Sequence, residues 1–237
     1  MIPSLDERLT RTIALLGQEN AQRIFHTSVM IIGCGAVGGY ALEMIARLGF
    51  KKIVVVDFDT FEPSNLNRQI LATAHTIGLK KCMVAKERVL SINPDAEVVA
   101  LDMKVTPDNL LFILTEQPDF VIDAIDDVAA KAALLAFLAE HDISVVSAMG
   151  AALKTKPELL KSATLDKTEG CHLAKKLREM LRKQQVDLKK INCVYSSESV
   201  KICKDENGQN ILGSLPIVPA VMGTMLASFV LQKTLEK

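Results

Sequence analysis

The stretch that decides the fold is Val29-Met-Ile-Ile-Gly33-Cys-Gly35-Ala-Val-Gly38. Its first four residues are apolar and predict a buried strand, and residues 41–48 have the spacing of a helix. Three glycines spaced in this way between a strand and a helix are typical of a phosphate-binding turn. The first permits the tight turn, the second lets a phosphate approach the backbone, and the third lets helix and strand pack closely. The alternative for the same residues is a purely structural glycine turn.

The pattern of an apolar run followed by a helical stretch repeats along residues 28–150. Further strands are predicted at 53–56, 98–101, 120–122 and 144–147, and helices at 81–92, from about Thr106, and at 128–140. Strands that are apolar throughout are those covered by helices on both faces. We therefore expect an α/β fold, a Rossmann-like mostly parallel sheet with helices on both faces, extended by a C-terminal α+β portion.

No linker rich in glycine, serine or proline divides the sequence, which predicts one domain over 1–237. Residues 1–150 are expected to form its nucleotide-binding part, and 151–237 its substrate-facing, core and dimer-forming part. With 237 residues, 49% hydrophobic and 24% charged, the chain can bury a sizeable core. This composition excludes a disordered, collagen-like or disulfide-scaffold protein.

The cysteines and the apolar segments bear on location. None of the five cysteines forms a C-x-x-C pair, so neither structural zinc nor a disulfide framework is expected. The polar N-terminal dozen residues predict no secretory signal, hence a cytoplasmic protein with reduced thiols. Residues 211–231 carry no charge, but prolines interrupt them and leave about a dozen residues of continuous helix after Pro219. A core or interfacial helix is expected there, with membrane contact as the minor alternative.

The charge of the chain is segregated. Its 28 basic and 28 acidic residues sum to zero, but residues 154–190 hold eleven basic and five acidic side chains, a net +6. The other 200 residues therefore carry −6. A basic segment of this kind is either a solvated surface or a contact for a polyanion such as RNA.

A polar stretch follows the second predicted strand. Asp57 ends that strand nineteen residues after Gly38, the distance at which an acidic residue accepts hydrogen bonds from ribose hydroxyls. The sequence then reads Asp57-Phe-Asp59-Thr-Phe-Glu-Pro-Ser-Asn65-Leu-Asn-Arg68-Gln69. This stretch has more donors and acceptors than a crossover loop requires, and it suits a triphosphate better than a nicotinamide.

Two further charged residues are expected at the same edge of the sheet. Lys81 starts a predicted helix, where a lysine can neutralise phosphate. Asp126 follows the fourth strand, where a carboxylate can hold Mg²⁺ that bridges to phosphates. Each has an ordinary alternative, since Lys81 could be a solvated helix residue, Asp126 a helix cap and Asn65 a turn former.

Residues 8–150 resemble the E1-like adenylate-forming enzymes, which include the activators of ubiquitin-like and sulfur-carrier proteins. The motifs that carry this resemblance are GCGAVGG, DFDTFEPSNLNRQ, IGLKK and VIDAIDD. The resemblance implies ATP and Mg²⁺ as cofactors, with Asp57 on the ribose and Asp126 on the ion. The phosphate contacts that it implies are Asn65, Arg68, Gln69 and Lys81. It also implies a homodimer in which Arg11 reaches the ATP of the partner subunit.

Over nearly the whole chain, the sequence resembles the bacterial tRNA threonylcarbamoyladenosine dehydratases. The segments that carry this resemblance are Asn93-Pro94, 105–109, 123–134, 174–178 and 193–198. Members of that group use ATP to activate the threonine carboxylate of threonylcarbamoyl-adenosine in tRNA, and ring closure expels AMP. The implied partner is tRNA, contacted through the basic segment 154–190.

Two other function classes stay open. An activator of a carrier protein would use a thiol as acyl acceptor, and Cys171 beside His172 is the best placed one. Such an activator fits the same nucleotide-binding half, and sulfur-relay proteins stay open as partners of the chain. A nicotinamide oxidoreductase or a nucleotide sensor would leave the polar stretch 57–69 and Lys81 without a task.

Overall fold

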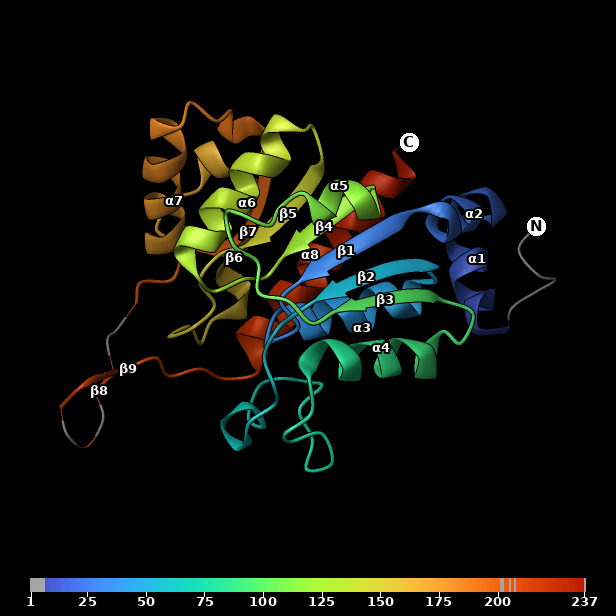
Figure 1. The fold of residues 1–237 in the computed structure, drawn as a ribbon, viewed down its shortest axis with the longest axis horizontal. Helices are drawn as coiled ribbons and strands as arrows, with labels where there is room; N and C mark the ends of the chain where they lie inside the picture. Colours follow the sequence, from blue (N-terminus) through green and yellow to red (C-terminus); the bar gives the residue numbers. More distant parts are fainter. Residues whose placement is uncertain (1–6, 201–202, 205, 207, 237) are drawn as a thin grey trace.

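The structure is a computed structural model that describes residues 7–200, 203–204, 206 and 208–236 (Figure 1). Its centre is a seven-stranded sheet in the order β3-β2-β1-β4-β5-β7-β6. Only β6 runs antiparallel, against β7, and the six other strands are parallel. The bounds are β1 Ser28–Ile32, β2 Lys52–Val56, β3 Glu97–Leu101, β4 Phe120–Asp123, β5 Ser144–Ala148, β6 Leu160–Thr164 and β7 Ile191–Ser196. The predicted α/β fold is confirmed.

Helices cover both faces of this sheet (Figure 1). One face carries α2 (Gln18–His26), α3 (Gly38–Leu48), α4 (Lys81–Ile92) and α8 (Ile217–Leu235). The other carries α5 (Phe112–Glu116), α6 (Val128–Glu140) and α7 (His172–Lys183). Successive residues of β1 alternate between the two cores, since Val29 and Ile31 pack on the first and Met30 and Ile32 on the second. The uniform apolarity of the strand follows from this two-sided burial.

The helix α8 holds most of the uncharged segment 211–231. It begins at Ile217, earlier than predicted, because Pro219 lies in its first turn, where a missing N–H costs no hydrogen bond. In the described part of the chain it is the one helix long and apolar enough to cross a membrane, and 44% of that apolar window is buried. It packs chiefly against α3, with Met222, Leu226 and Val230 fully buried. These contacts support the predicted core helix.

The helix predicted from Thr106 is wrong in its start. Residues 106–111 form turns, and α5 begins only at Phe112. The side chain of Asn109 accepts a hydrogen bond from the Thr106 N–H and donates one to the Lys104 carbonyl. A short polar side chain that bonds the backbone in this way competes with helix formation.

The remaining elements are short. The N-terminal helices are η1 (Glu7–Leu9) and α1 (Thr10–Leu16), and single 3-10 turns lie at η2 (Pro63–Asn65), η3 (Pro157–Leu159), η4 (Leu165–Lys167) and η5 (Leu188–Lys190). A two-stranded hairpin of β8 (Cys203–Lys204) and β9 (Asn210–Ile211) stands apart from the sheet (Figure 1).

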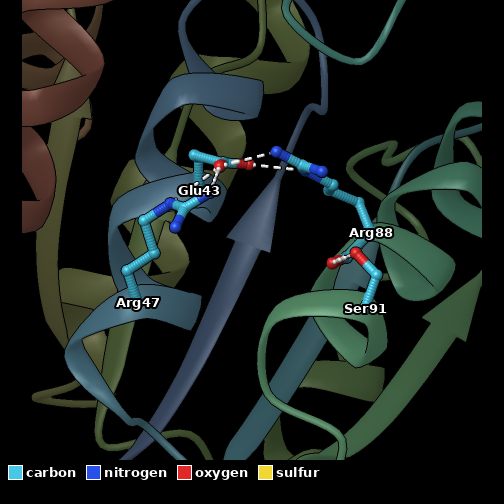
Figure 2. Close-up of polar contacts among 4 residues, drawn as sticks. All are labelled: Glu43, Arg47, Arg88 and Ser91. Atoms are coloured by element: carbon cyan, nitrogen blue, oxygen red, sulfur yellow. Dashed lines mark hydrogen bonds and ion pairs between the residues drawn. The ribbon is translucent and has the colours of Figure 1, made fainter. Parts of the chain in front are cut away.

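A buried carboxylate links α3 to α4. Glu43, only 4% exposed, accepts hydrogen bonds from Arg47 on its own helix and from Arg88 on α4 (Figure 2). Burial alone raises the pKa of Glu43, but the hydrogen bonds from Arg88 and Arg47 outweigh it, so that its pKa is lowered overall. The two helices that begin at the glycine turn and at Lys81 are thus joined near their middles.

Candidate active site

The glycine turn between β1 and α3 is tight. Gly33 has a φ of +92°, and a Cβ atom there would lie 2.7 Å from the Ala124 carbonyl oxygen. A Cβ on Gly38 would lie 1.7 Å from the Gly33 carbonyl oxygen, so both positions exclude any side chain. Gly35 differs, since the nearest atom to its Cβ position is the Gln69 Nε2 at 3.8 Å. The first and third glycines are required by packing, and the second leaves space above the backbone.

Asp57 joins this turn to the end of β2. Its Oδ2 accepts from the Cys34 N–H at 2.6 Å, and its Oδ1 accepts from the Asp59 N–H at 2.9 Å. The side chain is buried, and this burial raises the pKa of Asp57, although the two backbone hydrogen bonds oppose the rise. A carboxylate placed here has lone pairs left to accept from a sugar hydroxyl.

The predicted polar stretch folds back over the glycine turn. Lys81, buried at the start of α4, forms an ion pair with Asp59 at 3.0 Å. Asn65 is buried and caps the short helix η2, where its Oδ1 accepts from the Glu62 N–H at 3.1 Å. Arg68 is held by the Ser64 carbonyl and the Asn67 side chain, both at 2.8 Å.

Gln69 lies over the glycine turn with an unsatisfied group. It is buried, its Nε2 faces Gly35, and its Oε1 is one of two buried side-chain atoms in the described residues that lack a hydrogen-bond partner. A buried polar atom without a partner is costly. The amide is therefore suited to a ligand that enters beside Gly35.

Asp126 lies exposed just before α6, two residues after Ala124, the residue that packs against Gly33. No group of three or more metal-ligating side chains occurs in the described residues. Mg²⁺ in nucleotide sites is commonly held by one or two carboxylates together with phosphate oxygens and water, so a single exposed carboxylate fits such an ion. The neighbouring Asp127, not Asp126, is the helix cap, and its pKa is lowered chiefly by the hydrogen bond from the Ala130 N–H.

The carboxyl edge of the sheet thus gathers all but one of the predicted site residues: Gly33, Gly35, Gly38, Asp57, Asp59, Asn65, Arg68, Gln69, Lys81 and Asp126. Arg11 is the exception. It is exposed on α1, and Arg8 one turn earlier donates to the Ile92 carbonyl at the far end of α4 from Lys81. Twelve helical residues separate these ends by about 18 Å. The helix α1, which carries Arg11, therefore lies away from the carboxyl edge of the sheet in its own chain (Figure 1).

A charged group that sequence reasoning missed lies behind the glycine turn. The Lys131 ammonium and the Asp123 carboxylate form an ion pair at 2.7 Å, and both side chains are 0% exposed. A signal was present in the sequence, because Lys131 is the one charged residue in α6 before Glu140. A single charge in an apolar helix must find a partner inside the protein.

Four cysteine thiols of the described residues are buried, those of Cys34, Cys82, Cys171 and Cys193. Cys171 is 7% exposed and packs in the core beneath α7, as does Cys193, whose pKa is raised by burial. A nucleophile for acyl transfer has to be reached by its substrate and is favoured as a thiolate. The placement of Cys171 therefore does not favour a thioester step.

The basic segment 154–190 is spread over several elements, but α7 presents the most compact part. Lys175, Lys176, Arg182 and Lys183 are exposed and recur at the spacing of one helix face, with Glu179 among them. Other members are occupied, since Lys190 pairs with Asp142 and Lys154 donates to the Glu198 carbonyl.

Comparisons with known proteins agree with this geometry. The model of the ThiF family matches residues 8–237. The tRNA threonylcarbamoyladenosine dehydratase of Escherichia coli (strain K12) is 32% identical over 253 residues, which covers 98% of this chain and 94% of that protein. The enzyme of the same name from Bacillus subtilis (strain 168) is 34% identical over 199 residues, with 84% of this chain and 78% of the relative covered. The solved structure of the E. coli dehydratase in complex with ATP has a TM-score of 0.90 at 33% identity, covering 99% of this chain and 96% of the other.

Proposed function

Because the chain belongs to the ThiF family, we propose that it is an ATP-dependent tRNA threonylcarbamoyladenosine dehydratase. It adenylates the threonine carboxylate of threonylcarbamoyl-adenosine in tRNA and closes that group into a ring. The observation that carries the proposal is the likeness over nearly the full length to an E. coli enzyme of that name whose structure holds ATP.

The chemistry needs little beyond orientation and charge neutralisation. A carboxylate oxygen attacks the α-phosphorus of ATP, and pyrophosphate leaves. A group of the same modified nucleoside then attacks the acyl carbon, and AMP leaves, so that the product has lost one water. Because the second nucleophile lies in the substrate, no enzyme thiol is required, which agrees with the burial of Cys171.

The residues at the carboxyl edge match these needs. The turn Gly33–Gly35–Gly38 and the N-terminus of α3 receive phosphate, and Asp57 binds the ribose. Lys81 and Arg68 oppose the charge that accumulates on the leaving pyrophosphate. Lys81 would divide its donors between Asp59 and phosphate. Asn65 and Gln69 add hydrogen bonds, and the Gln69 Nε2, which faces Gly35, would be the donor to a phosphate oxygen.

Asp126 would hold Mg²⁺. When bound, such an ion neutralises phosphate charge and orients the triphosphate. The exposed carboxylate of Asp126, beside the glycine turn, supports this role.

For tRNA we propose contact through the basic segment 154–190. Within it, we propose contact through the exposed stripe of α7, which consists of Lys175, Lys176, Glu179, Arg182 and Lys183. Phosphate groups of the RNA backbone would release counterions on binding to this surface.

Arg11 supports a homodimer, because it is exposed and far from its own chain's site, so that a second subunit could receive it. We also propose that residues 1–237 form one domain, since the sheet continues from β5 into β7 and β6. The proposed location is the cytoplasm. A sulfur-relay partner stays a prediction from the resemblance alone.

The decisive experiment incubates the purified protein with ATP and tRNA that carries threonylcarbamoyl-adenosine. We expect stoichiometric AMP and a modified nucleoside one water lighter by mass spectrometry, and neither without ATP. A parallel reaction replaces tRNA with a small carrier protein that ends in Gly-Gly. Exchange of labelled pyrophosphate into ATP only in that reaction would refute the proposal and identify a carrier-protein activator.

A further inference from the structure

The buried ion pair of Lys131 and Asp123 is tied into the ends of two strands. Besides its 2.7 Å contact with the Asp123 Oδ2, the Lys131 ammonium donates to the Ala148 carbonyl at 3.1 Å and to the Ser147 hydroxyl at 3.3 Å. The Ser147 hydroxyl in turn donates to the same Asp123 oxygen at 2.6 Å. An ammonium has three protons, and each has an acceptor here.

The other oxygen of Asp123 acts on the turn that follows β4. Asp123 Oδ1 accepts from the Ile125 N–H at 3.1 Å, and the Ala124 N–H donates to the Ile32 carbonyl at 2.8 Å. Ala124 is thereby fixed against the glycine turn, where the Cβ position of Gly33 would lie 2.7 Å from the Ala124 carbonyl oxygen and that of Gly38 3.3 Å from the Ala124 Cβ. Ala124 alone therefore lies between Asp123 of the buried pair and the glycine turn that is proposed to bind phosphate.

Stability alone does not account for a charge at this position. The inner side of α6 is otherwise apolar, with Leu134, Leu135 and Leu138 all fully buried. The desolvation of two buried charges commonly consumes what their attraction returns, and a hydrophobic replacement of similar volume is often as stable. The pair instead connects the first turn of α6 rigidly to the ends of β4 and β5. Asp126 lies in the segment between Asp123 and Lys131.

We propose that Lys131 is a positioning residue of the adenylation reaction. Acting through Asp123, it fixes residues 124–126 so that the glycine turn and Asp126 keep the spacing that an ATP triphosphate requires. Lys131 touches no substrate, because its side chain is fully buried. The inference rests on the proposed function for the reaction, but its effect on ATP binding does not depend on which acyl group is activated.

The test removes both charges together, since Lys131→Met alone would strand the Asp123 carboxylate in the core and could prevent folding. The double variant Asp123→Asn/Lys131→Met is compared with wild type by hydrogen exchange of residues 124–127 and by ATP titration calorimetry without tRNA. We expect amide exchange in this segment to accelerate about tenfold or more, because local opening becomes easier. We expect the Kd for ATP to rise about tenfold or more, since a displaced glycine turn and a displaced Asp126 bind the triphosphate poorly. In the tRNA reaction kcat falls as well.

The matched control is Glu43→Gln/Arg88→Met, which dismantles the other buried carboxylate pair, between α3 and α4 (Figure 2). It should lower the thermal midpoint without changing exchange at 124–127 or the Kd for ATP. The proposal is overturned if the Asp123/Lys131 variant keeps wild-type exchange and ATP affinity, or if both variants lose ATP affinity in proportion to their thermal midpoints. A wild-type protein that binds ATP but releases no AMP with modified tRNA would refute the proposed function and leave this test intact.

Discussion

The Asp57 carboxylate accepts a hydrogen bond from the Cys34 backbone N–H at 2.6 Å, and this contact fixes the glycine turn against the end of β2. The same carboxylate is the proposed ribose ligand. Because burial raises its pKa, the ionised form is held at a cost to the fold.

We therefore predict that Asp57→Asn weakens ATP binding. A lost charge-assisted hydrogen bond of about 1.5–3 kcal/mol corresponds to roughly a 10- to 150-fold rise in Kd. Calorimetry on the wild type and the variant measures it, with circular dichroism to verify the fold. As the pH falls through the raised pKa of Asp57, the wild-type advantage should shrink, since the protonated carboxyl no longer accepts as an anion. An advantage that does not change with pH would argue against a ribose contact by this carboxylate.

The pKa of Glu43 is shifted in the direction opposite to that of Asp57. Its pKa is lowered in the folded protein, so its ionised form stabilises the fold above the unfolded-state pKa, and this contribution is lost as the pH falls through the folded-state pKa. Glu43→Gln should reduce the free energy of unfolding by about 1–3 kcal/mol at neutral pH. Urea denaturation over a pH series should show the difference from wild type diminishing in acid. Equal differences at pH 7 and in acid would contradict this account of the pair.

Arg11 and Lys81 can be tested in one complementation experiment. If Arg11 serves the partner's site, Arg11→Ala and Lys81→Ala homodimers are both inactive, but a mixed dimer contains one intact site. Random reassociation then restores about a quarter of the wild-type sites. AMP release after co-expression of the two variants measures the recovery. No recovery, with mixed dimers shown to form, would contradict service of Arg11 to the partner's site, and a fully active Arg11→Ala homodimer would place Arg11 outside the reaction.

Cys171→Ala separates the two adenylating reaction types. The thiol is buried at the N-terminus of α7, so its removal should cost about 1 kcal/mol of stability through a small cavity. AMP release with tRNA should stay within about twofold of wild type, because no enzyme nucleophile is needed. A thioester trapped on wild type but not on this variant would instead indicate acyl transfer through the protein.

The stripe on α7 predicts a salt-sensitive affinity. Lys175→Glu/Lys176→Glu should raise the Kd for tRNA about tenfold or more. It should also reduce the slope of the logarithm of this Kd against the logarithm of the salt concentration. Glu179→Lys, in the same stripe, should have the opposite effect. Filter binding at several salt concentrations measures both, and the Kd for ATP should not change in either. Identical salt slopes in all three proteins would exclude this surface as the RNA contact.

Much of the fold could be predicted because the apolar runs and the glycine turn are local signals. The helix at 81–92 and the strand at 53–56 follow from residue spacing alone, and the structure confirms them. The start of α5 could not be predicted in this way, because the Asn109 side chain competes with the helix for the backbone of Thr106.

The candidate site was predictable to a similar degree. Residues that lie in one sequence stretch, such as Asp57, Asp59 and Asn65, were found together because a loop carries them all to one sheet edge. The link from Lys131 to Asp123 was not found, because only tertiary packing shows that a helix lysine turns inward to meet a strand end. Whether Arg11 completes a second subunit's site depends on assembly, which no local pattern encodes.

The crossing of α8 over α3 has a consequence for the order of folding. A Cβ atom on Gly223 would lie 2.4 Å from the Val37 carbonyl oxygen, so the last helix of the chain packs directly beneath the turn that opens α3. The two residues of this contact are 186 positions apart in a chain of 237, and contacts so distant in sequence slow folding. During synthesis, α8 can therefore pack beneath this turn only after residues 217–235 have left the ribosome. A chain that ends before residue 217 lacks this contact at the turn between β1 and α3.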